Sequence, residues 1–358
     1  MKKDIYIASR FLTQNITGVQ RYGIELSIAI KKLNYEYNIE FISPRNIVHY
    51  EIANFLQVKQ IGILKGQLWD QISLLKFLKS KGNPLVLNFC NSLPVYYENK
   101  IVIIHDIIHL KFPVSYSYSY RKYYEIIFPL MLKHSRHIIT VSEFSKREMV
   151  HYFSINENKI SVIYNGINEK FTSRKLNSNE RYILGVSSIA YHKNFVGLIK
   201  AFQLLKNDNV KLYIVGGLNE KIFGKDSKKI LTEVKNSSKI KFIGRVDDDK
   251  LIELYSNAIC FVYPSLYEGF GIPPLEAQAC GCPVVLSDIP VFREVYGDSA
   301  IYVDPYSPED IAEKIQMLLD DERLRDILIQ KGFENAKKYT WENSAKSFFK
   351  VLDKISLL

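Results

Sequence analysis

A glycine- and proline-rich stretch between two apolar runs limits the possible folds of this chain more than any other feature. Within residues 263–285, Gly269 and Gly271 are followed closely by Pro273 and Pro274. Proline fits the first turn of a helix, because the N–H that it lacks would have no intrahelical acceptor there. Glycine adopts backbone conformations that other residues avoid, and it lets a ligand approach the main chain. The pattern predicts a strand, a glycine loop, a helix N-terminus and a second strand.

Two glutamates, Glu268 and Glu276, lie at the two sides of this predicted loop. A helix N-terminus attracts anions such as phosphate. Carboxylates repel phosphate but accept hydrogen bonds from hydroxyls. Phosphate and hydroxyls together indicate a nucleotide, a sugar or both. The alternative is a tight turn between two core elements, with Glu276 stabilising the first helical turn.

The rest of the chain has the pattern of two α/β domains. Its 358 residues are many for a single core, and 47% hydrophobic with 24% charged residues is typical of a soluble globular protein. Strand-like apolar runs alternate with amphipathic stretches, which predicts parallel sheets covered by helices. The polar residues 172–180 predict a linker between domains at 1–171 and 181–340, and residues 341–358 predict a last amphipathic helix.

The positive charge is concentrated in the first domain. Of a net charge of +10, residues 1–171 carry +9. A basic domain suits nucleic acid, anionic lipid or a phosphorylated acceptor, and the alternative is a solvated lysine-rich surface without a partner. No nucleic-acid motif accompanies the charge. No apolar run reaches the ~18–20 residues of a membrane span, and the N-terminus does not resemble a signal peptide. We therefore expect a cytoplasmic protein that can bind peripherally to the inner face of the plasma membrane.

Cysteine usage agrees with a reducing compartment. All four cysteines lie in or beside apolar runs, as expected for reduced, buried thiols. Cys280 and Cys282 flank one glycine, but no second pair of ligands is nearby, so no metal site is expected there.

The glycine-rich stretch and five other segments resemble, in matching order, the motifs of retaining glycosyltransferase family 4. The five segments are residues 17–22, 101–106, 140–146, 164–167 and 188–194. Within that family the chain looks like a mannosyltransferase-like enzyme of the bacterial surface-polysaccharide type, O-antigen or capsule. The family has the GT-B fold. The resemblance therefore implies two Rossmann-like, doubly wound domains facing across a cleft, with the C-terminal helix packing back on the first.

By this resemblance the second domain binds the donor. Lys193 would neutralise the pyrophosphate leaving group, Glu268 would accept hydrogen bonds from hydroxyls of the donor sugar, and Glu276 would bind the ribose hydroxyls. The main-chain amides that would hold the sugar and its phosphate are those at Gly269, Phe270, Gly271 and Leu275.

One cation of the family is missing from this chain. The family usually pairs its lysine with an arginine five or six residues earlier, where this chain has Ser187 and Ser188. Arg245 follows another predicted strand. It either supplies a second positive charge, flanks the nucleobase or lies on the surface.

The first domain contributes Gly18 and His105 by the same resemblance. Gly18 leaves the backbone free to approach a ligand at the carboxyl edge of a parallel sheet, where the family's loop approaches the donor phosphates and shapes the acceptor site. His105 ends a predicted strand beside Asp106, and the resemblance places it at the transferred sugar. A structural histidine is an alternative. A metal site at His105, Asp106 and His109 is a weaker one, because the family generally needs no catalytic metal.

The expected function is a retaining hexosyl transfer from a nucleotide sugar to a lipid-diphosphate-linked saccharide, without a metal or other cofactor. GDP-mannose is the first candidate donor, with UDP- and dTDP-sugars as rivals. The expected partners are this donor, the acceptor and an anionic membrane surface, but no nucleic acid. A GT-B epimerase or phosphorylase is one alternative. A non-catalytic sugar-binding or partner protein is another, which the missing arginine favours and the intact Lys193, Glu268 and Glu276 disfavour.

Overall fold

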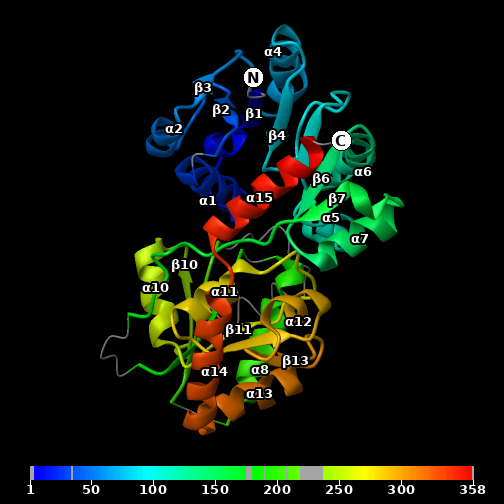
Figure 1. Cartoon of the computed structure of the whole chain (residues 1–358). Helices are drawn as coiled ribbons and strands as arrows, with labels where there is room; N and C mark the ends of the chain where they lie inside the picture. Colours follow the sequence, from blue (N-terminus) through cyan, green and yellow to red (C-terminus); the bar gives the residue numbers. More distant parts are fainter. Residues whose placement is uncertain are drawn as a thin grey trace. The chain divides into compact units, whose positions relative to one another are not determined.

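The chain folds into two compact units (Figure 1). The computed structural model describes residues 4–33, 35–174, 180–188, 190–206, 209–217 and 237–356, with backbone alone at 119, 120 and 356. Unit 1 comprises Met1–Leu110, Tyr118–Gly166 and Trp341–Leu358, and unit 2 comprises Lys111–Ser117 and Ile167–Thr340.

These bounds differ from the expected ones at two places. The first unit ends at Gly166 rather than at residue 171, and the short segment 111–117 belongs to unit 2. The segment joins unit 2 because the Oγ atom of Ser115 lies 3.0 Å from Nδ1 of His192. Of the expected linker 172–180, residues 175–179 lie outside the described residues.

Unit 1 contains a seven-stranded parallel sheet in the order β3-β2-β1-β4-β5-β6-β7. The strands are β1 (Asp4–Ala8), β2 (Asn38–Ser43), β3 (Lys59–Gln60), β4 (Leu85–Asn88), β5 (Lys100–Ile103), β6 (His137–Thr140) and β7 (Ile160–Val162). The central strands are almost continuously apolar because helices cover both faces of the sheet. In the central register, Ile7 pairs with Phe41 on one side and Leu87 on the other.

The helices of unit 1 bury part of their surface in its core, except the short α3. They are α1 (Gly18–Leu33), α2 (Tyr50–Leu56), α3 (Gly66–Leu68), α4 (Leu75–Ser80), α5 (Ile108–Lys111), α6 (Tyr118–Lys133), α7 (Glu143–Phe153) and α15 (Trp341–Ser356). A π-helical turn, η2 (Trp69–Leu74), joins α3 and α4 into one continuous helical segment. α15 packs against α1, and its Phe349 ring stacks on Tyr35 at 4.2 Å.

Unit 2 contains a six-stranded parallel sheet in the order β10-β9-β8-β11-β12-β13. Its strands are β8 (Tyr182–Val186), β9 (Lys211–Val215), β10 (Ile240–Gly244), β11 (Cys260–Tyr263), β12 (Val284–Ser287) and β13 (Ile301–Val303). Its helices are α8 (Phe195–Leu204), α10 (Asp248–Asn257), α11 (Ile272–Ala279), α12 (Pro290–Tyr296), α13 (Pro308–Asp320) and α14 (Glu322–Ala336). β11, α11 and β12 confirm the strand–loop–helix–strand order predicted for residues 263–285.

Both sheets are doubly wound, and each has one point where the strand order reverses. That point lies between β1 and β4 in unit 1 and between β8 and β11 in unit 2. Loops that follow the two strands at such a point run in opposite directions and leave a crevice at the carboxyl edge, where α/β proteins bind ligands. Among the described residues, no helix is long and apolar enough to cross a membrane.

Candidate functional site

An ion pair joins the two loops at the reversal point of unit 2. Lys193 ends the short helical turn η5 (Tyr191–Lys193) after β8, and Glu268 lies in the loop after β11. Lys193 Nζ lies 2.5 Å from Glu268 Oε1 and donates a second hydrogen bond to the Tyr263 hydroxyl at 3.0 Å. The two loops are also held by a backbone hydrogen bond from Leu266 N to His192 O.

The ion pair is buried, with 13% of the Lys193 and 10% of the Glu268 side chain exposed. Burial alone lowers the pKa of Lys193, but the Glu268 carboxylate and the Tyr263 hydroxyl outweigh it and hold that pKa above its usual value. Burial and Glu268 also raise the pKa of Tyr263 to about 12. Lys193 is therefore a fixed cation at neutral pH. A buried charged cluster in a ligand-binding crevice is a candidate functional site.

The glycine loop after Glu268 leads into the N-terminus of α11. Gly271, the residue before the helix, has a φ of +92°, and a Cβ on it would lie 2.7 Å from the Phe292 ring. The Tyr296 hydroxyl donates a hydrogen bond to the carbonyl oxygen of Gly271. Only glycine fits this position without strain, so the loop conformation follows from the sequence.

Replacing Gly271 by alanine should destabilise unit 2. The new side chain would need a left-handed backbone conformation and would have to displace the fully buried Phe292. We expect a loss of about 2 kcal/mol or more in the free energy of unfolding, measured by urea denaturation. Gly18→Ala is the control, because a Cβ at Gly18 meets nothing within 4 Å. Equal stability of the two variants would contradict the strain argument.

The other predicted donor-binding residues, in α11 and in the loop before it, differ in which of their atoms a ligand can contact. Glu276 is 6% exposed, and its Oε2 accepts a hydrogen bond from the Tyr255 hydroxyl at 3.4 Å. The side chain of Leu275 is fully buried, and that of Phe270 is 2% exposed and packs edge-on against Tyr339. Leu275 and Phe270 can therefore contact a ligand only through their main-chain atoms, and the same holds for Gly269, which has no side chain.

Arg245 lies at the carboxyl edge of the same sheet but not in the Lys193–Glu268 pair. It is exposed and directly follows β10, which β9 separates from β8. Its guanidinium Nε would lie 3.4 Å from a Cβ on Gly217, so it covers the end of β9. The described part of unit 2 thus shows no second cation at the ion pair in place of the family's arginine.

In unit 1, His105 lies at the carboxyl end of β5 and is 8% exposed. Its Nε2 is 2.9 Å from the carbonyl oxygen of Phe89. A carbonyl oxygen can only accept, so Nε2 carries the proton and Nδ1 is left as an acceptor. Burial lowers the pKa of His105 to about 4. The Tyr22 ring packs edge-on at 4.7 Å, which fixes the imidazole as a neutral, oriented group.

Gly18 is exposed at the first position of α1, and the space where its side chain would be is open. Asp106 accepts a hydrogen bond from the backbone N–H of Ile108 at 2.9 Å, close to the start of α5. Within the described ranges, no three His, Cys, Asp or Glu side chains gather as a metal site would require.

One polar cluster at the carboxyl edge of unit 1 was not predicted. Arg10, after β1, has its Nε 3.0 Å from Asp70 Oδ2, and Ser92, after β4, donates to the same oxygen at 2.7 Å. Burial raises the pKa of Asp70 to about 6, although Arg10 and Ser92 oppose the shift. Asp70 lies on the π-helical turn η2, and such turns are frequent at functional sites. The three residues lie on separate elements, so no local pattern marks them.

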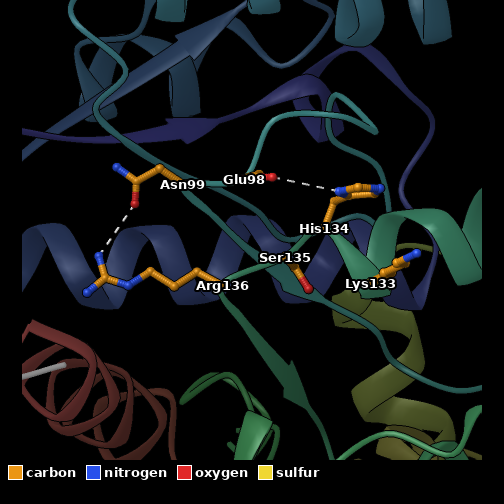
Figure 2. A pocket seen from close by; sticks show the side chains of 6 residues that line it. All are labelled: Glu98, Asn99, Lys133, His134, Ser135 and Arg136. Carbon is orange, nitrogen blue, oxygen red and sulfur yellow. Dashed lines mark hydrogen bonds and ion pairs between the residues drawn. The ribbon is translucent and has the colours of Figure 1, made fainter.

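A cavity of about 420 Å³ lies elsewhere in unit 1 (Figure 2). It is lined by Glu98, Asn99, Lys133, His134, Ser135 and Arg136. These residues precede β5 and β6, so the cavity lies at the amino edge of the sheet. The predicted residues lie at the carboxyl edge, and the cavity is therefore separate from the candidate site.

Comparison with known proteins identifies the family. Residues 166–335 match the family described as glycosyl transferases group 1, and residues 73–171 match glycosyltransferase family 4. The O-antigen chain mannosyltransferase RfbU of Salmonella typhimurium is 32% identical over 343 residues, which cover 90% of this chain and 94% of RfbU. The chain therefore belongs to this family of glycosyltransferases, and it is an enzyme of the transferase class.

Two further relatives bear on the fold and the substrates. N,N'-diacetylbacillosaminyl-diphospho-undecaprenol alpha-1,3-N-acetylgalactosaminyltransferase of Campylobacter jejuni is 29% identical over 246 residues, which cover 64% of this chain and 63% of that enzyme. The structure of HepE from Anabaena in complex with UDP-glucose superposes with a TM-score of 0.77 at 14% identity, covering 98% of this chain and 99% of HepE. At that identity the likeness shows the fold alone, which is GT-B with two parallel-sheet, Rossmann-like domains.

Proposed function

We propose that the protein moves a hexose from a nucleotide sugar to a lipid-diphosphate-linked saccharide in the synthesis of a surface polysaccharide, O-antigen or capsule, at the inner face of the plasma membrane. The observation that carries the proposal is the buried cluster of Lys193, Glu268 and Tyr263 at the reversal point of unit 2. The names of RfbU and of the Campylobacter enzyme support the pathway and the class of acceptor. The donor would be GDP-mannose, or a UDP- or dTDP-sugar.

Stabilisation of the leaving group is the main electrostatic task of such a transfer. The bond from the anomeric carbon to the diphosphate breaks while positive charge develops on the sugar ring. Lys193, already held in position by Glu268 and Tyr263, would balance the negative charge that develops on the diphosphate. The main-chain amides of the Gly271 loop and of the first turn of α11 would add hydrogen bonds. Because Lys193 would supply this charge, we propose that no metal or other cofactor is needed.

Glu268 would serve both the protein and the donor sugar. Its Oε1 accepts from Lys193, and its Oε2 would accept a hydrogen bond from a hydroxyl of the hexose. In unit 1, the acceptor-binding unit of this proposal, Nδ1 of His105 would accept from a hydroxyl of the transferred sugar. The acceptor hydroxyl would attack from the face that the diphosphate leaves, with retention of the anomeric configuration. Gly18 would shape the acceptor side and Arg245 would flank the nucleobase.

Glu276→Ala should weaken the binding of the nucleoside diphosphate about 10- to 100-fold, because two hydrogen bonds from the ribose to a charged group would be lost. Isothermal titration calorimetry measures the change directly. Tyr255→Phe is the control, since it removes only the hydroxyl that contacts Glu276 at 3.4 Å. An unchanged affinity of Glu276→Ala would remove the ribose assignment.

A panel of GDP-, UDP- and dTDP-sugars tests the proposed function as a whole. We expect one nucleotide class to raise the melting temperature and its sugar to be hydrolysed slowly without acceptor. A response to no member of the panel would favour the non-catalytic alternative. Release of an epimerised sugar, or of a sugar phosphate when inorganic phosphate is added, would favour the epimerase or phosphorylase alternative.

A further inference from the structure

One surface of unit 1 combines exposed apolar side chains with lysines. It lies on the loop after β3 and on the helical segment of α3, η2 and α4. We name it the lysine–apolar face, and it consists of Ile63, Lys65, Leu68, Ile72, Lys76, Lys79 and Lys81. Ile63 is 76% exposed, Leu68 60% and Ile72 42%, and all four lysines are exposed.

The helical segment has two different sides. Trp69, Leu74 and Leu78 are fully buried in the core of unit 1. Leu68 and Ile72 are one turn apart on the outer side, which continues through the exposed lysines of α4. A helix with a packed inner side needs no apolar residues outside, so the outer ones are not explained by folding.

The loop before the helix packs against the side of the helical segment that carries Trp69 and Ser73. Trp69 Nε1 donates a hydrogen bond to the carbonyl oxygen of Ile61 at 2.8 Å. A Cβ on Gly62 would lie 2.5 Å from the Cβ of Ser73. This close approach brings Ile63 beside the helix. Ile63, the residue after Gly62, is therefore exposed next to the helical segment that carries Leu68 and Ile72.

The charge of this surface is uniformly positive. Asp70 is the one acidic residue within 61–81, and it is fully buried and paired with Arg10. Among the residues that the structure describes, none of the four lysines forms an ion pair. The lysine of β3 next to this segment, Lys59, does pair, with Glu40 at 2.8 Å. The positive potential of the face is therefore not cancelled locally.

This combination fits an anionic lipid surface better than a protein. Interfacial segments insert apolar side chains at the boundary of headgroups and acyl chains while lysines contact anionic headgroups. Protein interfaces are instead depleted in lysine and enriched in aromatic residues and arginine. The lysine–apolar face contains four lysines, and no aromatic residue or arginine.

We infer that the lysine–apolar face is the surface by which this protein binds an anionic membrane. Leu68 and Ile72 enter the headgroup boundary, and the lysines of α4 contact anionic headgroups. The inference deepens the proposed function, because it assigns the contact through which the enzyme reaches a lipid-linked acceptor. Binding to lipid needs neither donor nor acceptor, so the membrane-binding inference and the proposed function can fail separately.

The buried side of the same segment holds the carboxyl edge of the sheet. Gln71 donates to the carbonyl of Leu93 at 3.0 Å and accepts from the backbone N–H of Val95 at 2.9 Å. The loop after β4 that it holds also carries Phe89, whose carbonyl accepts from His105. Membrane contact through the outer side would thus set the height and tilt of His105 above the bilayer, because both belong to one compact unit.

Cosedimentation with vesicles of phosphatidylglycerol and phosphatidylcholine tests the inference. Each lysine near an anionic surface contributes about fivefold to the partition coefficient, so Lys76→Gln/Lys79→Gln should lower it about 30-fold. Leu68→Ser/Ile72→Ser should lower it at least about tenfold through lost apolar burial. Pure phosphatidylcholine vesicles should bind the unaltered protein weakly.

Matched variants elsewhere separate a specific face from general charge. Lys337→Gln/Lys350→Gln removes two exposed lysines, one directly after α14 and one on α15. Met317→Ser/Ile327→Ser removes two exposed apolar side chains, on α13 and α14. Both control pairs should leave the partition coefficient within about threefold of that of the unaltered protein. The inference would be overturned if the partition coefficient fell equally in the Lys76/Lys79 and Lys337/Lys350 variants. It would also be overturned if neither the Lys76/Lys79 nor the Leu68/Ile72 variant lowered the partition coefficient.

A fluorescent label shows which surface enters the lipid. All four native cysteines are buried, so a single introduced cysteine can be labelled selectively. The emission of an environment-sensitive dye at Leu68→Cys should shift to the blue on vesicle addition, and that at Met317→Cys should not. Binding of the donor nucleotide should be unchanged in all these variants. Normal lipid binding with no response to any donor would refute the proposed function and leave this inference intact.

Discussion

Replacement of Lys193 by methionine should lower the free energy of unfolding of unit 2 by about 3 kcal/mol and slow sugar transfer at least about 100-fold. Methionine preserves most of the side-chain volume but removes the cation. Glu268, with 10% of its side chain exposed, would be left as a buried carboxylate without its counter-ion. Denaturant unfolding and steady-state kinetics with the active donor measure the two effects.

The double variant Lys193→Met/Glu268→Gln separates stability from catalysis. With both charges removed, no uncompensated charge remains buried, so most of the lost unfolding free energy should return. Transfer should stay slow, because the cation that balances the leaving diphosphate is still missing. Stability and activity that recover together would mean that Lys193 acts on the rate only through folding.

An exposed ion pair of the same unit is the control. Lys211 lies 2.5 Å from Glu180, but both side chains are more than a third exposed. Lys211→Met should therefore cost less than about 1 kcal/mol and leave transfer unchanged. A loss of about 3 kcal/mol in this variant too would contradict the assignment of the Lys193 effect to burial.

The order of elements around Gly271 was predictable because its causes are local. Pro273 and Pro274 mark a helix start, and Gly271 adopts a φ that glycine alone accepts readily. The α/β class followed from alternating apolar runs and amphipathic stretches in the same way. The boundary between the units was placed less well, because segment 111–117 is held by residues far along the chain, such as His192.

The contacts within the candidate sites were not predictable from local patterns. Lys193 and Glu268 are 75 residues apart, and only the order of strands β8 and β11 brings them together. Resemblance named both residues but not their ion pair. Arg10 lies in the short 3-10 turn after β1 (Arg10–Thr13) and Asp70 lies in η2. Both were missed, because an isolated arginine or aspartate in sequence indicates an exposed side chain.

Acidification from about pH 7 to about pH 5 should destabilise unit 1 by about 4 kcal/mol. Burial lowers the pKa of His105, His109 and His137 to about 4 each. The unfolded chain, whose histidines titrate near 6.5, therefore binds more protons in this window, and stability falls as the pH falls. Asp70 opposes this in part, because its pKa is raised to about 6 and protonation favours the folded state.

The free energy of unfolding of unit 2 should fall by about half as much over the same pH range. Its one described histidine is His192, whose pKa is lowered to about 2 by burial and by Lys193. Hydrogen exchange of peptides from each unit measures the two losses separately. His137→Gln should reduce the loss in unit 1 by about 1–2 kcal/mol, because one group that the folded state keeps neutral is removed. His151→Gln, at an exposed position of α7, should not. Equal pH dependence in both units, or in both variants, would show that burial of these histidines does not set the acid stability.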